Sequence, residues 1–261
     1  MVRRRPALIA LAALLTAGHI GASAGAPAAR PLRVCVLDTP VPPYFNLDAG
    51  HTGWSERLML ETGRSLGLRI EIRTEPVRRC LKMLEQGETD AIIAAPVAEN
   101  LELMRFPMKA DGVDRERRLV SVNLVWVKRR DSPTDWDGQA MTGLPPNAPR
   151  LKVIVRAGLG VGVNAVTDLG YEIEESGANI HSALRMLNAG RFDLLLGVQE
   201  LVNVSLRDPA LHQLVVMSRP LMRLDFYVAA SRRLDPASMA HFERWWQLMG
   251  ELRDHPSFNR D

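Results

Sequence analysis

The sequence contains few of the features that mark metal proteins and the common hydrolases. Two cysteines and six scattered histidines in 261 residues show no C-x-x-C or H-x-x-x-H spacing, so no metal site is expected. No Walker loop and no Ser–His–Asp or Cys–His arrangement can be recognised from the spacing. Glycine and proline occur at ordinary levels, 19 and 17 residues, which argues against collagen-like and disordered chains. We expect a globular protein that is not an enzyme and that needs no cofactor.

The chain also lacks an excess of charge of one sign. Its 33 basic and 30 acidic residues give a net charge of +3. The three additional basic residues are Arg3, Arg4 and Arg5, at the start of the chain. The remainder is balanced, so we expect no nucleic acid or other polyanion as a partner.

Long hydrophobic runs are absent as well. The apolar stretch over residues 6–17 is shorter than the roughly 20 residues that a membrane-spanning helix needs. It follows the three arginines and precedes two A-x-A sites, at Ala22-Ser23-Ala24 and Ala26-Pro27-Ala28. This order predicts a cleaved signal peptide over residues 1–28 and export of a soluble protein to the periplasm.

The two cysteines are Cys35 and Cys80. In an oxidising compartment an even pair favours one disulfide, which would close a loop of about 45 residues. The alternative is two buried free thiols, one in a strand and one in a helix.

An internal repeat is the most informative pattern in the chain. Residues 80–93 read CLKMLEQGETDAII, and residues 183–196 read ALRMLNAGRFDLLL. Gly87 and Gly190, and likewise Asp90 and Asp193, are 103 positions apart. Each copy predicts a helix with a Leu/Met face, a glycine in the left-handed conformation after the helix, and then an apolar strand. The repeat indicates two similar α/β lobes.

The rest of the pattern agrees with two lobes. Strands alternate with helices of 10–12 residues, which indicates βαβ units and a mostly parallel sheet. The expected strands are 32–37, 69–73, 91–95, 119–127, 152–155, 172–174, 193–196 and 225–230. The expected helices include 55–66, 77–86 and a C-terminal helix over 236–253, whose apolar stripe we interpret as core. The predicted fold is α/β, with two Rossmann-like lobes joined by hinge strands.

Ligands on such sheets bind beyond the carboxyl ends of the strands. Four segments have that position: 38–45, which contains Tyr44 and Phe45; 94–97; the glycine-rich 157–162; and 197–200. An aromatic residue in the first segment could stack on a ligand or simply plug a turn. Amides in the third could hold an anion, or the segment could be a plain glycine turn.

Several segments together resemble the bacterial periplasmic solute-binding proteins of extracellular family 3. They are the leader, Val34-Cys35-Val36 followed by Pro42-Pro43-Tyr44, the segment 76–91, and the segment 184–193 with its Gly-Arg-Phe-Asp. The resemblance covers nearly all of the chain after the leader. It implies a type 2 periplasmic binding protein-like fold that closes around a small polar solute, usually as the receptor of an ABC importer.

Two departures from the family pattern bear on the ligand. Amino-acid binders of this family usually carry an arginine after a Thr-x-Glu segment, and the matching position here is Asn100. They also carry an aspartate shortly after the Gly-Arg-x-Asp segment, where this chain has Gln199. Because charged contacts orient such ligands most strongly, a standard α-amino acid is not the expected ligand.

From these observations we predict the following division and site. The division is 1–28 signal peptide, 29–122 first part of lobe 1, 123–222 lobe 2, and 223–261 return to lobe 1. The expected ligand-binding residues are Tyr44 and Trp54 for stacking, Ala95 and Gly160 through their backbones, and Asn100 and Gln199 as polar contacts. We expect a monomer with a small-molecule ligand and a membrane permease or sensor as partner. The alternatives are a non-transport accessory or sensory module on the same fold and, less favoured, a dehydratase-like enzyme.

Overall fold

The computed structural model describes residues 30–46, 52–156, 159–176, 179–256 and 258. The predicted signal peptide therefore lies outside the described residues. Within them, three parallel strands form the sheet of the first lobe in the order β2-β1-β3. These are β1 (Leu32–Leu37), β2 (Ile70–Glu75) and β3 (Ala91–Ala94), and they are joined through α1 (Trp54–Ser65) and α2 (Val77–Gln86).

The second lobe repeats this arrangement. Its parallel strands have the order β11-β10-β12. They are β10 (Lys152–Arg156), β11 (Glu172–Ser176) and β12 (Leu194–Val198), with the helices α4 (Gly160–Asp168), α5 (Ile180–Asn188) and α6 (Gln199–Ser205). The predicted βαβ units are confirmed in both lobes. The short helix α6 was not predicted, because its seven residues directly follow the repeat strand.

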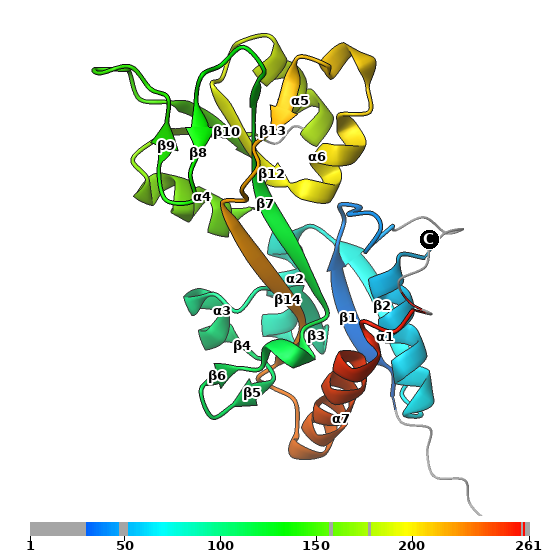
Figure 1. Cartoon of the computed structure of the whole chain (residues 1–261). Helices are drawn as coiled ribbons and strands as arrows, with labels where there is room; N and C mark the ends of the chain where they lie inside the picture. Colours follow the sequence, from blue (N-terminus) through cyan, green and yellow to red (C-terminus); the bar gives the residue numbers. More distant parts are fainter. Residues whose placement is uncertain (1–29, 47–51, 157–158, 177–178, 257, 259–261) are drawn as a thin grey trace, which may run out of the picture.

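Two long antiparallel strands connect the lobes (Figure 1). They are β7 (Val120–Arg129) and β14 (Met222–Ser231). Strand β12 pairs with β7 on the side of the second lobe, and β3 pairs with β14 on the side of the first, so one sheet runs through the molecule. The prediction of two α/β lobes joined by hinge strands is confirmed.

The remaining elements surround this frame. The chain passes through α3 (Ala98–Leu103), β4 (Met104–Arg105), the β5–β6 pair (Met108–Lys109 and Gly112–Val113), a 3₁₀ turn (Arg115–Arg117), the β8–β9 pair (Asp135–Trp136 and Met141–Thr142), a second 3₁₀ turn (Pro209–Leu211), β13 (Leu214–Val216) and α7 (Pro236–Leu252). Helix α7 follows β14 and packs on the first lobe beside α1 (Figure 1).

The repeated aspartates, Asp90 and Asp193, accept the same kind of hydrogen bond in their two lobes. The Asp90 carboxylate accepts a hydrogen bond from the backbone N–H of Arg33, in the first strand of its lobe, at 2.8 Å. The Asp193 carboxylate accepts one from the backbone N–H of Lys152, in the corresponding strand, also at 2.8 Å. The glycines of the two copies have φ angles of 75° and 72°, as the pattern predicts. The repeat is therefore structural, since each aspartate fixes the start of the next strand against the first.

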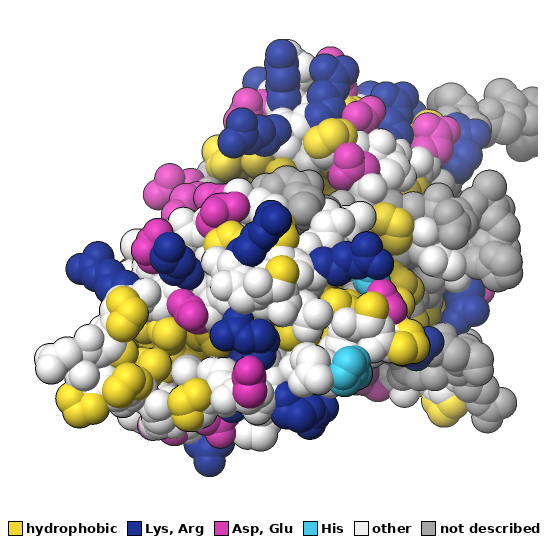
Figure 2. Space-filling model, turned by 90° about the horizontal axis from the view of Figure 1, so that it is seen from above, with side chains coloured by type: hydrophobic (Ala, Val, Ile, Leu, Met, Phe, Trp, Pro, Cys, Tyr) yellow, Lys and Arg dark blue, Asp and Glu magenta, His cyan; other side chains and the backbone are white. Residues whose placement is uncertain are grey.

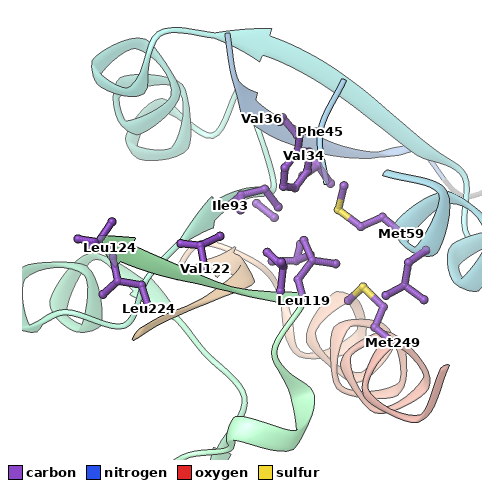
Figure 3. Packing of buried hydrophobic residues seen from close by; sticks show 14 of the residues in the cluster. Val34, Val36, Phe45, Met59, Ile93, Leu119, Val122, Leu124, Leu224 and Met249 are labelled. Atoms are coloured by element: carbon purple, nitrogen blue, oxygen red, sulfur yellow. The ribbon is translucent and has the colours of Figure 1, made fainter. Parts of the chain in front are cut away.

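The core is made of the apolar faces of these elements. Figure 3 shows Val34 and Val36 of β1, Ile93 of β3 and Val122 of β7 gathered in the first lobe. The stripe of the C-terminal helix is core, as predicted, because Phe242, Trp246 and Met249 are buried.

The indole N–H of Trp245 donates to the Thr62 hydroxyl at 2.9 Å, so α7 and α1 are joined by a polar contact as well. A disulfide joins Cys35 and Cys80, the pairing that the sequence favours. It connects strand β1 to helix α2.

Figure 2 shows basic and acidic side chains interspersed over the face of the second lobe that is seen from above. Among the described residues, no helix combines the length and the apolar character needed to cross a membrane.

Candidate ligand-binding cleft

A cavity of about 590 Å³ lies between the two lobes. Its walls include the segment after β1, the first turn of α2, the start of α4, the end of β12, the start of hinge strand β7 and the middle of hinge strand β14. The carboxyl ends of parallel strands and the N-termini of helices from both lobes thus meet at one place, as expected for this class of sheet. The volume is within the usual range for small-molecule sites.

The loop that carries Tyr44 is held in place by the N-terminus of α1. The backbone N–H of Trp54 donates to the Pro43 carbonyl at 3.0 Å, and that of Ser55 donates to the Tyr44 carbonyl at 3.1 Å. A Cβ atom at Gly53 would collide with the Tyr44 carbonyl, so glycine is required for this close approach. The first free amides of a helix thereby position an aromatic side chain at the cavity.

Tyr44 lines the cavity and also connects the two lobes. Its hydroxyl donates a hydrogen bond of 2.7 Å to the Glu200 carboxylate on α6. Burial raises the pKa of Tyr44, and the hydrogen bond to Glu200 raises it further. The hydroxyl therefore stays protonated and remains a donor at every physiological pH.

Trp54 lies beside Tyr44, with ring centroids 5.3 Å apart and ring planes at 76°. This edge-to-face contact stabilises the Tyr44 ring from one side. Trp54 itself is not among the residues that line the cavity. The structure thus places the two predicted stacking residues together: Tyr44 lines the cavity, and Trp54 packs against the Tyr44 ring.

Asn100 and Ala95 contact each other and do not line the cavity. The side-chain amide of Asn100, on α3, donates to the Ala95 carbonyl at 2.8 Å. The same carbonyl accepts from the backbone N–H of Val97 at 2.9 Å. The residue at the family's arginine position is therefore used to hold the turn after β3.

Gly160 is the first residue of α4 and lines the cavity from the second lobe, opposite the Tyr44 loop. Gln199 is the first residue of α6, and its Oε1 accepts a hydrogen bond from the Asn123 side chain at 2.9 Å. Asn123 belongs to hinge strand β7, so Gln199 contacts the hinge and not the cavity.

Most of the cavity wall is apolar, and sequence reasoning missed several of the residues that form it. The hinge strands supply Val120, Val122 and Phe226, and the helices add Ile180 and Leu201. An alternating apolar pattern in a long strand is the only signal for the hinge residues, and the same pattern is typical of an ordinary core. The sequence therefore could not separate them from the core.

Among the described residues, the charged side chains that line the cavity are few, and they are exposed to solvent. They are Asp38 and Arg78 from the first lobe and Glu175 from the second. The described residues contain no group of three or more histidine, cysteine, aspartate or glutamate side chains that could hold a metal ion.

Comparisons with known proteins give matches to the fold of this chain and none to its sequence. No protein-family model matches the sequence, and no curated protein matches it either. Solved structures match closely in shape. A histidine kinase sensor domain with similarity to periplasmic binding proteins has 20% identity and a TM-score of 0.64, over 88% of this chain and 92% of that one.

Two further solved structures are binding proteins. The GluR0 ligand-binding core from Nostoc punctiforme, in complex with L-glutamate, has 14% identity and a TM-score of 0.63, covering 87% of this chain and 95% of that one. The substrate-binding protein of an amino acid ABC transporter has 14% identity and a TM-score of 0.61, covering 87% and 96%. At these identities the likeness concerns the fold alone. The chain has the two-lobed α/β fold of the periplasmic binding proteins, as its motifs predicted.

Proposed function

We propose that this protein binds a small molecule in the cleft between its lobes and has no catalytic role. The observation that supports this most directly is the cavity of about 590 Å³ to which both lobes and both hinge strands contribute. A ligand that touches both lobes favours the closed arrangement by the difference in its affinity for the closed and open forms. A membrane partner could then distinguish the two forms.

The predicted signal peptide and the Cys35–Cys80 disulfide support a location in an oxidising compartment, which we take to be the periplasm. For the division of the chain we propose the predicted one, with lobe 2 over residues 123–222 and lobe 1 made of the segments on either side. We propose a permease of the ABC type as the membrane partner.

A sensory role is the second candidate, and one observation favours it. A histidine kinase sensor domain has this fold, so the fold occurs in a sensory protein as well as in a transporter component. The two candidates share the cleft and differ in the partner that responds to its closure.

The cleft can be tested by filling it at Gly160. A Cβ atom at this position would meet no other atom within 4 Å, so a larger side chain enters open space. A thermal-shift screen of the mature protein would cover amino acids, polyamines, organic acids, sugars and aromatic acids. A ligand at 100 times its Kd stabilises the folded protein by about 2.7 kcal/mol. For a protein of this size the melting temperature then rises by about 5–10 °C.

We expect Gly160→Trp to abolish the shift that a ligand produces, with the unliganded melting temperature nearly unchanged. Gly160→Ala is the matched control and should retain the shift. A ligand whose stabilising effect survives the tryptophan substitution binds elsewhere, and this result would contradict a cleft-binding function.

A further inference from the structure

The walls of the cleft identify a class of ligand. We infer that the cleft accepts an apolar small molecule, aromatic or branched aliphatic, that carries at most one charged group, in place of a zwitterionic α-amino acid. This inference rests on the proposed function and names its ligand chemistry.

Apolar side chains face the cavity from all three parts of the molecule. The first lobe contributes Val36 and Ile93, the hinge contributes Val122 and Phe226, and the second lobe contributes Leu201. An apolar molecule that packs against these walls loses contact with water along them. A zwitterion would lose the hydration of two charged groups, and each would need a partner in return.

The residues that the sequence predicted as polar or aromatic ligand contacts are already engaged with other groups of the protein. Asn100 donates to the Ala95 carbonyl, and Gln199 accepts from Asn123, so both satisfy groups of the protein itself. Tyr44 donates to Glu200 across the cleft. Of these groups only the Glu200 carboxylate is charged, and its buried Oε2 has no hydrogen-bond partner among the described residues, which leaves a place for one donor on a ligand and not for both charges of a zwitterion.

The charged side chains at the cavity cannot replace a buried clamp. Asp38, Arg78 and Glu175 are exposed, and contacts between a ligand and solvated charges contribute little to affinity. They are suited to a single head group at the entrance while the apolar body occupies the interior. Affinity then comes mainly from the body of the ligand.

Four probes that share a phenyl ring and differ in their head group show how much each part of a ligand contributes to affinity. They are 3-phenylpropionate, 3-phenylpropylamine, 3-phenylpropanol and phenylalanine, and isothermal titration calorimetry measures each with the mature protein. We expect at least one of the first three to bind tenfold or more tightly than phenylalanine. Its heat-capacity change should be negative, as for burial of apolar surface.

A pair of substitutions on one helix locates the binding. Leu201 lines the cavity from α6, whereas Val204, on the same helix, is 46% exposed and lies outside it. Leu201→Asn should weaken binding of the best probe at least tenfold, and Val204→Asn should leave it unchanged. The far-ultraviolet circular dichroism of both variants checks that the fold is intact.

The outcomes distinguish the inference from the function on which it rests. If phenylalanine binds more tightly than the three other phenyl probes, and Gly160→Trp abolishes that binding, the ligand class is wrong and the cleft function stands. If neither a phenyl probe nor the branched aliphatic acid 4-methylpentanoate binds at millimolar concentration, the inference is also overturned. If a probe binds the Leu201→Asn and Gly160→Trp variants as tightly as it binds the wild-type protein, both the inference and the cleft function fail for that probe.

Discussion

Asp90 is a buried charged residue that joins the start of β3 to β1 in the first lobe. It is only 3% exposed, and its two carboxylate oxygens receive hydrogen bonds of 2.9 and 3.0 Å from the Arg30 guanidinium. The Arg33 backbone N–H supplies a third. Burial raises the pKa of Asp90, but the hydrogen bonds from Arg30 and Arg33 lower it more, so the net pKa lies below its ordinary value.

Asp90→Asn should therefore destabilise the protein. The substitution removes the negative charge of a buried side chain that accepts hydrogen bonds from a guanidinium and a backbone N–H. We therefore expect the free energy of unfolding at pH 7 to fall by about 1–3 kcal/mol. Chemical denaturation followed by circular dichroism measures the change. Asp193→Asn is the matched control at the repeated position. It should cost less, since Asp193 is less buried and is bonded to the Lys152 backbone N–H.

The lowered pKa also fixes the direction of a pH dependence. A carboxylate whose pKa is lower in the folded than in the unfolded state stabilises the protein fully above its unfolded pKa, about 4. That contribution disappears as the pH falls through the folded pKa. The difference in stability between wild type and Asp90→Asn should thus be constant from pH 8 to pH 5 and shrink toward pH 3. A difference that grows on acidification would contradict this account.

At the scale of the elements, the disulfide joins β1 to α2 on the side of the first lobe that carries the cleft. Both cysteines are 1% exposed, so the bond belongs to the packed interior. Helix α2 begins at the cavity, where Val77 lines it, and Cys80 is one turn further along. The bond thereby anchors one wall of the cleft to the central strand of its sheet.

Removal of the disulfide should lower the stability of the protein, because the unfolded chain becomes less restricted. Closure of a loop of 45 residues restricts the unfolded state, and the loop-entropy relation gives about 4 kcal/mol as an upper value. We expect a loss of about 2–4 kcal/mol for the double variant Cys35→Ala, Cys80→Ala, measured by urea denaturation. Dithiothreitol should destabilise the wild-type protein and leave the double variant unaffected. Equal sensitivity of the two proteins would show that the bond contributes nothing.

For the whole molecule, the hydrogen bond between Tyr44 and Glu200 is a direct contact across the cleft. The two residues are 156 positions apart in the chain and belong to different lobes. The second oxygen of Glu200, Oε2, is buried and has no hydrogen-bond partner among the described residues. The contact therefore holds the lobes together at some cost to the carboxylate, which is suited to an arrangement that can open.

Tyr44→Phe should shift the unliganded protein toward the open form. The substitution removes the hydroxyl and keeps the ring that packs against Trp54. A half-buried hydrogen bond to a carboxylate contributes about 1 kcal/mol, which corresponds to about a fivefold change in the ratio of open to closed molecules. Small-angle X-ray scattering should record a larger radius of gyration.

Tyr171→Phe serves as the control for that measurement, since Tyr171 packs against Trp126 within the second lobe and is not among the residues that line the cavity. If Tyr44→Phe and Tyr171→Phe give the wild-type radius of gyration, the Tyr44–Glu200 contact does not hold the lobes together.

Features that depend on residues close together in the chain could be predicted from the sequence, and features that depend on distant residues were harder to predict. The strands and helices, the two lobes and the core stripe of α7 could be predicted, because apolar periodicity, helix-ending glycines and an internal repeat are local patterns. The candidate site was harder. Tyr44 and Gly160 follow strands, and the structure places both at the cavity. Asn100 was chosen by family position, and only its geometry reveals that it holds the turn after β3.

Local patterns along the chain were thus enough to predict the α/β lobes and the return strand, since they depend on neighbours a few residues away. The disulfide was favoured over two free thiols because the chain has two cysteines. The character of the cleft depends on residues that are far apart in the chain. Val122 and Phe226 have the alternating pattern of a core strand, and only the packing of two lobes around the hinge exposes them to a cavity. The same packing brings Tyr44 to Glu200, because a contact between lobes is decided by tertiary geometry and leaves no periodic signal in the sequence.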